Sequence, residues 1–219
     1  MELTFLISCV LGIIEGLTEF APVSSTAHIL VAGKVFGIIP SSFFTVFTVA
    51  IQSGAILAAV AFFWKTVLKN ISLIPKVLVG FIPTATVGLL IHSYISELFK
   101  HTWIIAVMLI VGGIVFLFLK PNDSPVELVS ISYKEAFLIG CSQVLALIPG
   151  VSRSGATLIG GTALKIPRSH IVAFSFLLGI PTILGASVVE LQSTPTLSGS
   201  QWLLIAAGTV VSFITALLT

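Results

Sequence analysis

Charged residues are scarce in this sequence. Only 8% of the 219 residues are charged, whereas 57% are hydrophobic. A water-soluble domain carries roughly 25% charged residues because its surface must be solvated. A surface this poor in charge must face lipid, so we expect one polytopic membrane domain over residues 1–219. The net charge of +2 and the scattered basic residues do not suggest nucleic acid as a partner.

Cysteines and N-terminal basic residues are also few. Cys9 and Cys141 each lie in an apolar helical pattern, which predicts buried small hydrophobic residues without a disulfide or redox role. No basic residue precedes the apolar run 3–14, and Glu15 follows it instead of a small-residue cleavage site. A signal peptide would show both features. We therefore expect the N-terminal segment to remain in the mature protein.

Long apolar runs make up most of the chain. A helix that crosses a bilayer needs about 20 mostly apolar residues. The segments that meet this length are Phe43–Trp64, Pro75–Ile95, Trp103–Leu119, Ile171–Leu191 and Trp202–Thr219. Tryptophans stand at the ends of three of them, where interfacial aromatic residues are enriched.

Two stretches, Leu3–Phe36 and Tyr133–Leu164, contain polar residues in their middle and read as helix, polar break, helix. Irregular backbone at membrane depth is tolerated only where protein or a water-filled cavity surrounds it. Each stretch is therefore predicted to be a re-entrant hairpin. The two also resemble each other: Gly12-x-x-Glu15 matches Gly140-x-x-Gln143, and Phe81–Thr84 echoes Gly179–Thr182. Such weak internal symmetry is typical of a duplicated membrane protein.

The basic residues indicate the orientation. With three spans between the hairpins, seven basic residues fall on one side and only Lys34 and Lys100 on the other; the seven are Lys65, Lys69, Lys76, Lys120, Lys134, Lys165 and Arg168. The positive-inside rule makes the first side cytoplasmic. If Tyr133–Leu164 crossed the membrane completely, the asymmetry would shrink to five against four, so the hairpin is favoured.

These patterns predict an all-α integral membrane protein with an inverted-topology repeat of transmembrane helices. The repeats cover about residues 1–100 and 103–219, and their two re-entrant helical hairpins meet near the midplane.

Glu15 and Glu19 are four positions apart, so they share one face of the first helix. Ionised residues within a membrane are costly and are functional by default. Two close carboxylates either share a proton or hold a cation between them. The alternative is that both glutamates lie at the interface and reach for water, which their short side chains do poorly.

A run of hydroxyl residues follows Pro22: Ser24, Ser25 and Thr26, with His28 close behind. Such a run is often only a helix N-cap. A hydroxyl nucleophile, however, needs a nearby base or metal, and this hairpin offers both. His28 is either a packed side chain or a group that transfers protons.

Arg153 lies in the break of the second hairpin. A guanidinium keeps its charge, so it needs an anion as a partner. Its neighbours offer hydroxyls, flexible backbone and a helix start, which together suit a phosphate; they are Gly150, Ser152, Ser154, Gly155 and Thr157. The alternative is that Arg153 only neutralises one of the two glutamates.

The runs Glu15–His28 and Leu145–Thr157 closely resemble the two signatures of bacterial undecaprenyl-diphosphatase, the bacitracin-resistance family. Weaker similarity continues through Ile51–Ile56 and Phe174–Leu178, so the resemblance covers nearly the whole chain. It implies a membrane enzyme that removes one phosphate from undecaprenyl diphosphate and so regenerates the lipid carrier for cell-wall synthesis.

The resemblance also implies a divalent cation, Mg²⁺ or Ca²⁺, held by Glu15 and Glu19. The family's catalytic residues fall on Glu15, Glu19, Ser25, His28 and Arg153. We expect the substrate to contact Ser24, Thr26, Gly150, Ser152, Ser154, Gly155 and Thr157 as well.

The implied location is the bacterial cytoplasmic membrane, with the site open to its outer, periplasmic side. The expected partners are the polyprenyl diphosphate lipid and the bilayer; the oligomeric state stays open, a homodimer among the alternatives. Two departures from the family stand out: Ala27 replaces a usual glycine, and relatives continue with a further helix, which suggests a shortened form. The main rival function is a transporter or flippase of an anionic polyprenyl-phosphate lipid. A scaffold role would leave the polar residues unexplained.

Overall fold

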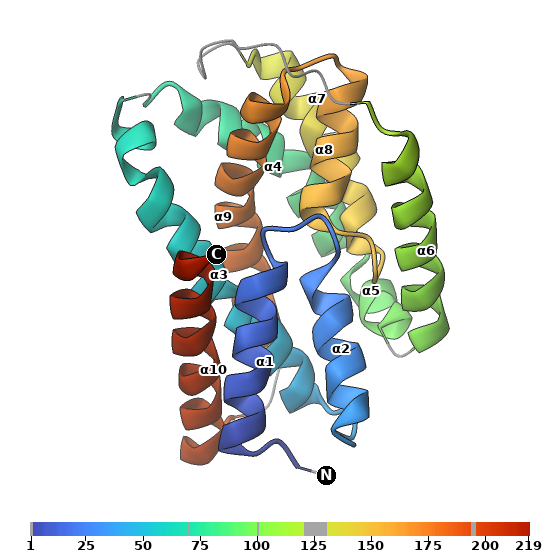
Figure 1. Cartoon of the computed structure of the whole chain (residues 1–219), viewed down its shortest axis with the longest axis vertical. Helices are drawn as coiled ribbons and strands as arrows, with labels where there is room; N and C mark the ends of the chain where they lie inside the picture. Colours follow the sequence, from blue (N-terminus) through green and yellow to red (C-terminus); the bar gives the residue numbers. More distant parts are fainter. Residues whose placement is uncertain (1, 70, 100, 121–130, 194–195) are drawn as a thin grey trace. The chain divides into compact units, whose positions relative to one another are not determined.

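The structure is a computed structural model that describes residues 2–69, 71–99, 101–120, 131–193 and 196–219. Within these ranges the secondary structure is helical (Figure 1), with ten α-helices and the 3-10 helix η1. The prediction of an all-α protein is confirmed at this level. The elements are α1 Phe5–Thr18, α2 Ser25–Val35, α3 Ser42–Lys69, α4 Leu73–Leu90, α5 His92–Leu98, α6 Thr102–Phe118, α7 Tyr133–Gln143, η1 Val144–Leu147, α8 Arg153–Ala163, α9 Arg168–Ser193 and α10 Gly199–Leu218.

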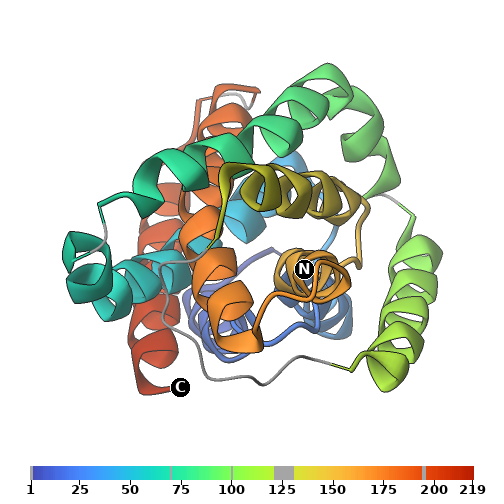
Figure 2. The ribbon, with the colours of Figure 1, turned by 90° about the horizontal axis from the view of Figure 1, so that it is seen from above.

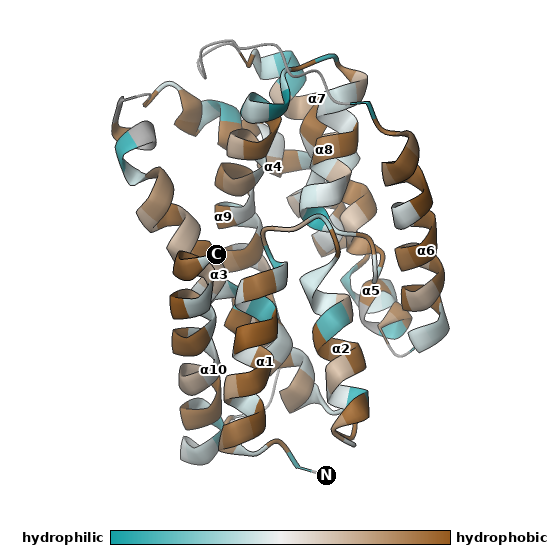
Figure 3. Ribbon diagram, in the orientation of Figure 1, coloured by the Kyte–Doolittle hydropathy of each residue, from teal (hydrophilic) through white to brown (hydrophobic). Residues whose placement is uncertain are grey.

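Four of the described helices are long and apolar enough to cross a membrane, namely Ser42–Lys65, Leu73–Leu90, Arg168–Gln192 and Gly199–Leu218. The chain is therefore a multi-pass membrane protein. Helix α6 has 17 residues and is apolar along nearly its whole length (Figure 3), which is at the short end of the range for a spanning helix. Most of its large side chains are exposed, as a lipid-facing helix requires.

Two sequence predictions are wrong in detail. The segment Pro75–Ile95 is not one helix: α4 ends at Leu90, and Ile91 leaves the helical region at φ −115° and ψ 20° before α5 begins. The break coincides with the change from an apolar run to the polar pair His92-Ser93. Cys141 is exposed rather than buried, and Cys9 is only partly buried. A thiol behaves as a small hydrophobic group, so an exposed position on a membrane helix suits it.

The chain forms two compact units that do not coincide with the halves of the sequence. Unit one contains Met1–Ala21, Ser25–Phe62 and Ile183–Thr219, and unit two contains Pro22–Ser24 and Phe63–Thr182. Helices α3 and α9 each contribute a segment to both units. The core of unit one is built on Leu11, Ile29, Phe47 and Ile51, and that of unit two on Ile139, Ile171, Phe174 and Leu178.

In unit one, α1 packs along α10 (Figure 1). The two backbones come close because Gly12 carries no side chain: a Cβ atom there would lie 2.5 Å from the carbonyl oxygen of Gly208. Gly16, one turn later, faces the Ser212 carbonyl oxygen in the same way. Small residues permit this close approach of helices in membranes. The packing fixes the face of α1 that carries the glutamates.

In unit two, α7 packs along α4 (Figure 2). Here Gly140 faces the carbonyl oxygen of Gly80, and a Cβ atom at residue 140 would collide with that oxygen. The Thr84 hydroxyl adds a hydrogen bond by donating to the Gly140 carbonyl oxygen at 3.3 Å. Each unit therefore holds the first helix of one predicted hairpin against a long helix from the other half of the sequence.

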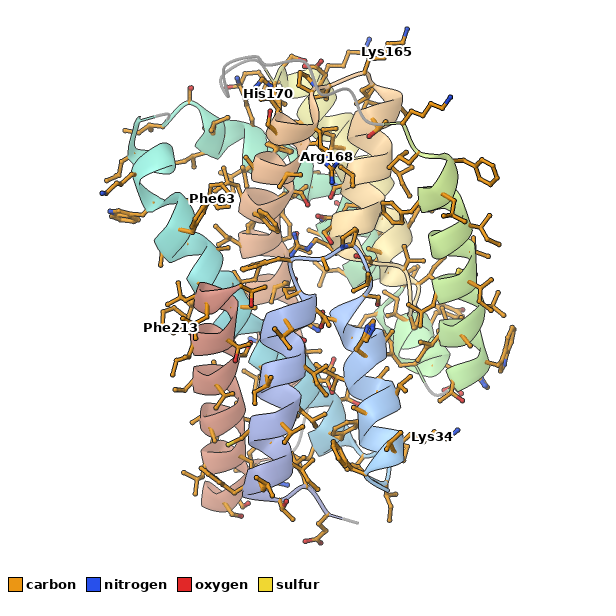
Figure 4. The ribbon with its side chains drawn as sticks, in the orientation of Figure 1. Lys34, Phe63, Lys165, Arg168, His170 and Phe213 are labelled. Atoms are coloured by element: carbon orange, nitrogen blue, oxygen red, sulfur yellow. The ribbon has the colours of Figure 1, made fainter. Side chains whose placement is uncertain are left out.

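Both hairpin stretches form helix, break, helix, as the sequence predicted, and their second helices end in the same way. Beyond α2, Gly37 has φ +69° and Ile38 donates its N–H to the Gly33 carbonyl oxygen at 2.9 Å. Beyond α8, Lys165 has φ +60°, and Ile166 donates to the Gly161 carbonyl oxygen at 3.1 Å. Both are Schellman-type caps. Lys165 lies at the end of unit two where α8 ends and α9 begins (Figure 4).

Candidate active site

The acidic pair lies at the end of α1 and is buried, although both residues are carboxylic acids. Glu15 is 0% exposed and Glu19 is 7% exposed. Glu19 is the C-cap of α1, and its N–H donates to the Glu15 carbonyl oxygen at 2.9 Å. Helical geometry therefore continues through both residues and puts their side chains on one face, as predicted.

Ser25, the first residue of α2, joins this pair. Its hydroxyl donates to Glu19 Oε2 at 2.5 Å, and both side chains are buried. A hydrogen bond from a hydroxyl to a carboxylate is short and strong because the acceptor is charged. The contact aligns the serine proton with a base, which is the geometry that activates a hydroxyl nucleophile. The sequence predicted the two residues as site members but not this contact.

The remaining candidates of the first hairpin surround Ser25 in the sequence. Ser24 has φ +62°, a left-handed conformation that is unfavourable for a residue with a side chain. The Thr26 hydroxyl accepts a hydrogen bond from Nε2 of Gln52 on α3 at 2.9 Å. His28, one helical turn after Ser25, is exposed. Sequence reasoning missed Gln52, whose signal was its place in the weakly similar stretch Ile51–Ile56.

The second cluster lies in unit two at the start of α8. Ser152 is the N-cap of this helix, and its Oγ accepts a hydrogen bond from the Gly155 N–H at 3.1 Å. The Ser152 and Ser154 hydroxyls are 3.0 Å apart and hydrogen bonded. Gly150 has φ +94°, and a Cβ atom there would lie 2.7 Å from the Ile105 carbonyl oxygen. The turn before Arg153 thus requires glycine both for its conformation and for its contact with α6.

Arg153, the first residue of α8, lies against α9. Its Nη1 donates to the Ser175 carbonyl oxygen at 2.7 Å. A Cβ atom on Gly179 would lie 2.5 Å from that same nitrogen, so the guanidinium rests on the bare backbone of α9. These contacts with the backbone of α9 fix the position of the Arg153 guanidinium within unit two.

Thr157 is completely buried and ties α8 to α9. Its hydroxyl lies 2.6 Å from the Ser175 hydroxyl and also donates to the Ser154 carbonyl oxygen at 2.9 Å. Ser175 therefore contacts both Arg153 and Thr157. Sequence reasoning did not select Ser175, although the similar stretch Phe174–Leu178 contains it.

The predicted site residues thus fall into two clusters. Unit one brings together Glu15, Glu19 and Ser25, with Thr26 and His28 on the same helix as the serine. Unit two contains Ser24, Gly150, Ser152, Arg153, Ser154, Gly155 and Thr157.

A divalent cation fits the donor set of the first cluster. Across the described ranges, no group of three or more histidine, cysteine or acidic side chains could hold a metal ion. Glu15 and Glu19 offer two carboxylates, and Ser25 adds a hydroxyl oxygen. Mg²⁺ is commonly held by one or two carboxylates, with water and substrate phosphates as its other ligands. The hard oxygen donors present suit such an ion.

Fold and site together define a multi-pass helical membrane protein whose candidate site residues lie in two helix-break-helix segments. A comparison with protein families matches residues 8–219 to the family described as bacitracin resistance protein BacA. The chain belongs to this family, which confirms the resemblance found in the sequence.

Curated relatives cover nearly the whole chain. It is 42% identical to the undecaprenyl-diphosphatase of Campylobacter jejuni over 216 residues, which are 96% of this chain and 80% of that protein. It is 41% identical to the undecaprenyl-diphosphatase of Persephonella marina, over 96% of this chain and 85% of the relative. The undecaprenyl-diphosphatase of Bdellovibrio bacteriovorus is 34% identical over 99% of this chain and 84% of its own length.

Proposed function

We propose that this chain is an undecaprenyl-diphosphatase that hydrolyses undecaprenyl diphosphate to undecaprenyl phosphate and inorganic phosphate. The product is the lipid carrier that cell-wall synthesis uses again. The observation that carries the proposal is the buried contact between the Ser25 hydroxyl and Glu19, with Glu15 one turn away. Its relatives bear the name of this activity.

The reaction needs a nucleophile, a base and a set of groups that bind the phosphate, which we call the phosphate grip. The Ser25 oxygen or a water molecule attacks the terminal phosphorus, and the bond between that phosphorus and the bridging oxygen breaks. Glu19 takes the proton of the nucleophile, because it already accepts the serine hydrogen bond at 2.5 Å. His28 passes a proton to or from solvent, since it is exposed one turn along α2. If Ser25 attacks, water then hydrolyses the phosphoserine.

The phosphate grip is assigned to the second cluster. Arg153 stabilises the negative charge of the phosphoryl oxygens. The N–H groups at the start of α8 and the Ser152 and Ser154 hydroxyls add further donors. Glu15 and Glu19 would hold the divalent cation, which when bound offsets charge on the diphosphate. Catalysis of this kind is chiefly positioning and charge stabilisation.

We propose that both clusters serve the hydrolysis and that the chain contains an inverted repeat. Equal intervals of sequence separate Gly12 from Gly140 and Ser25 from Arg153. The members of each pair have the same structural role, since the glycines contact a carbonyl oxygen of a partner helix, and Ser25 and Arg153 begin the second helix of a hairpin. Two equivalent broken segments of this kind are the pattern expected of an inverted repeat in a membrane protein.

Helix lengths support the re-entrant hairpins. Helix α1 has 14 residues, and α2, α7 and α8 have 11 each. At about 1.5 Å per residue they extend about 21 Å and 16 Å. The hydrocarbon core is about 30 Å thick. Each helix thus ends before it could cross the membrane.

The charge pattern supports a location in the cytoplasmic membrane with the lysine-rich ends inside. Lys165, where α8 ends and α9 begins, lies at one end of unit two (Figure 4); Lys100 lies outside the described residues. The site then opens to the outer, periplasmic side.

Phosphate release from undecaprenyl diphosphate by the purified chain in detergent tests this function. We expect one phosphate per lipid, undecaprenyl phosphate as the lipid product, and loss of activity with a chelator that added Mg²⁺ or Ca²⁺ reverses. Binding of the lipid without phosphate release would contradict the proposal and would favour the transporter.

A further inference from the structure

A strip on α9 contacts both ends of the break in the second hairpin. Ser175, Gly179 and Thr182 are four and three positions apart, so they lie on one face of this helix. Ser175 and Gly179 contact Arg153 at the start of α8. Thr182 contacts Gln143, the last residue of α7.

The contact of Thr182 with Gln143 has a fixed hydrogen-bond direction. The Thr182 hydroxyl donates to the Leu178 carbonyl oxygen at 2.7 Å, and that of Thr84 donates to the Gly140 carbonyl oxygen at 3.3 Å. Both oxygens can therefore only accept from the glutamine. Gln143 Nε2 lies 3.0 Å from each of them, so its amide group clamps α7 between α4 and α9. The two Ile-Pro-Thr motifs of the sequence supply the two arms of this clamp.

We infer that Ser175, Gly179 and Thr182 are positioning residues for the phosphate grip, which rests on the proposed function. They fix where α7 ends and where α8 begins, and with them the turn between. Thr157 acts through the strip, because its buried hydroxyl is bonded to Ser175 and to the carbonyl oxygen of Ser154. Its contribution is to lock α8 onto α9 rather than to touch the substrate.

The contacts of Arg153 with α9 also explain why position 153 requires arginine and not lysine. One nitrogen of the guanidinium, Nη1, is engaged by the Ser175 carbonyl oxygen. The planar fork keeps further N–H donors directed away from this contact. A lysine has no fork, so it could not hold the α9 carbonyl and a phosphate in one fixed geometry.

The test uses pairs of variants of the full chain. Ser175→Ala and Thr182→Val remove the hydroxyls, and Ser175→Thr and Thr182→Ser restore them. Ser187→Ala is the control, because its hydroxyl lies on the same helix but contacts Ser53 and the Val49 carbonyl oxygen. We expect kcat to fall at least about tenfold in the first two variants, since small misplacements of a catalytic group are costly. KM should change little, and the restoring variants and the control should keep near-normal kcat.

A second comparison separates positioning from stability. Ser175→Ala combined with Arg153→Lys should lose far less than the product of the two single losses, because the Ser175 hydroxyl acts only through Thr157, which fixes the start of α8 that carries Arg153. Melting temperatures in detergent should stay close to that of the wild type. Unchanged turnover in Ser175→Ala and Thr182→Val, losses that multiply with Arg153→Lys, or losses that follow a lower melting temperature would each overturn the inference. An inactive wild type would instead refute the proposed function.

Discussion

At the residue scale, two helix starts carry the residues to which we assign the proposed chemistry. Ser25 begins α2 and donates to a buried glutamate, and Arg153 begins α8 and rests on α9. The sequence predicted both residues because polar groups in an apolar chain are conspicuous. It could not predict the contacts around them, since Gln52 reaches Thr26 and Ser175 reaches Arg153 from helices distant in the sequence. Ordinary polar residues become important here only through packing.

The acidic pair gives the first prediction. Glu15→Gln and Glu19→Gln should each lower kcat/KM and raise at least about tenfold the cation concentration for half-maximal activity, because hard cations prefer ionised oxygen ligands. Titration of phosphate release with Mg²⁺ measures this. Glu97→Gln on the exposed α5 is the matched control and should behave like the wild type. An unchanged cation requirement in both variants would remove the pair from the metal site.

The second prediction concerns Arg153→Lys. The variant keeps the charge but loses the fork, so we expect normal expression and folding with a loss of at least about 100-fold in kcat/KM, the usual effect of removing one transition-state contact. Steady-state phosphate release and the melting temperature are the two measurements. Near-normal turnover would mean that charge alone suffices, as for an arginine that only neutralises a glutamate.

At the scale of elements, close glycine contacts hold the hairpins. In α1 and α7 the equivalent glycines face a carbonyl oxygen of another helix. The sequence patterns Gly12-x-x-Glu15 and Gly140-x-x-Gln143 predicted this equivalence of the two glycines. The echo of Phe81–Thr84 in Gly179–Thr182 has another structural role. It lies in α4 and α9, at a different interval of sequence, and serves the clamp around Gln143. Only the contacts distinguish the two kinds of similarity.

The third prediction is that Gly12→Ala and Gly140→Ala destabilise the protein by about 1–3 kcal/mol, the usual cost of overpacking. The added methyl group meets backbone oxygen, which cannot rotate away. Gly112→Ala on α6 is the control, because nothing lies within 4 Å of its Cβ position. Thermal unfolding in detergent compares the three. Equal melting temperatures for Gly12→Ala and Gly112→Ala would contradict the packing of α1 on α10.

At the scale of the whole molecule, composition was enough to predict a helical multi-pass protein, because too few charges exist to solvate its surface. Composition could not predict which helices pack together within each unit. Each unit combines helices from both halves of the sequence, and an apolar pattern does not specify which helix will be its partner.

The fourth prediction concerns orientation. Single cysteines replace Ser72, Ser93 or Ser169, all exposed, in a Cys9→Ala, Cys141→Ala background. An impermeant thiol reagent added to intact cells should label position 93 and leave positions 72 and 169 protected, because the positive-inside rule predicts that the lysine-rich ends are cytoplasmic. Labelling is repeated after permeabilisation as the control. Outside labelling of position 169 with position 72 protected would exclude the second hairpin.

The central claim is that the Glu19 cluster and the Arg153 cluster both serve the proposed hydrolysis of undecaprenyl diphosphate. Its most direct test is a double-mutant cycle on kcat/KM for phosphate release, with Glu19→Gln, Arg153→Lys and their combination. Residues that act as a unit on one transition state are strongly non-additive. We predict that kcat/KM of the double variant is only slightly lower than that of the less active single variant. Losses that multiply would contradict the account, because they would show that the Glu19 cluster and the Arg153 cluster act independently.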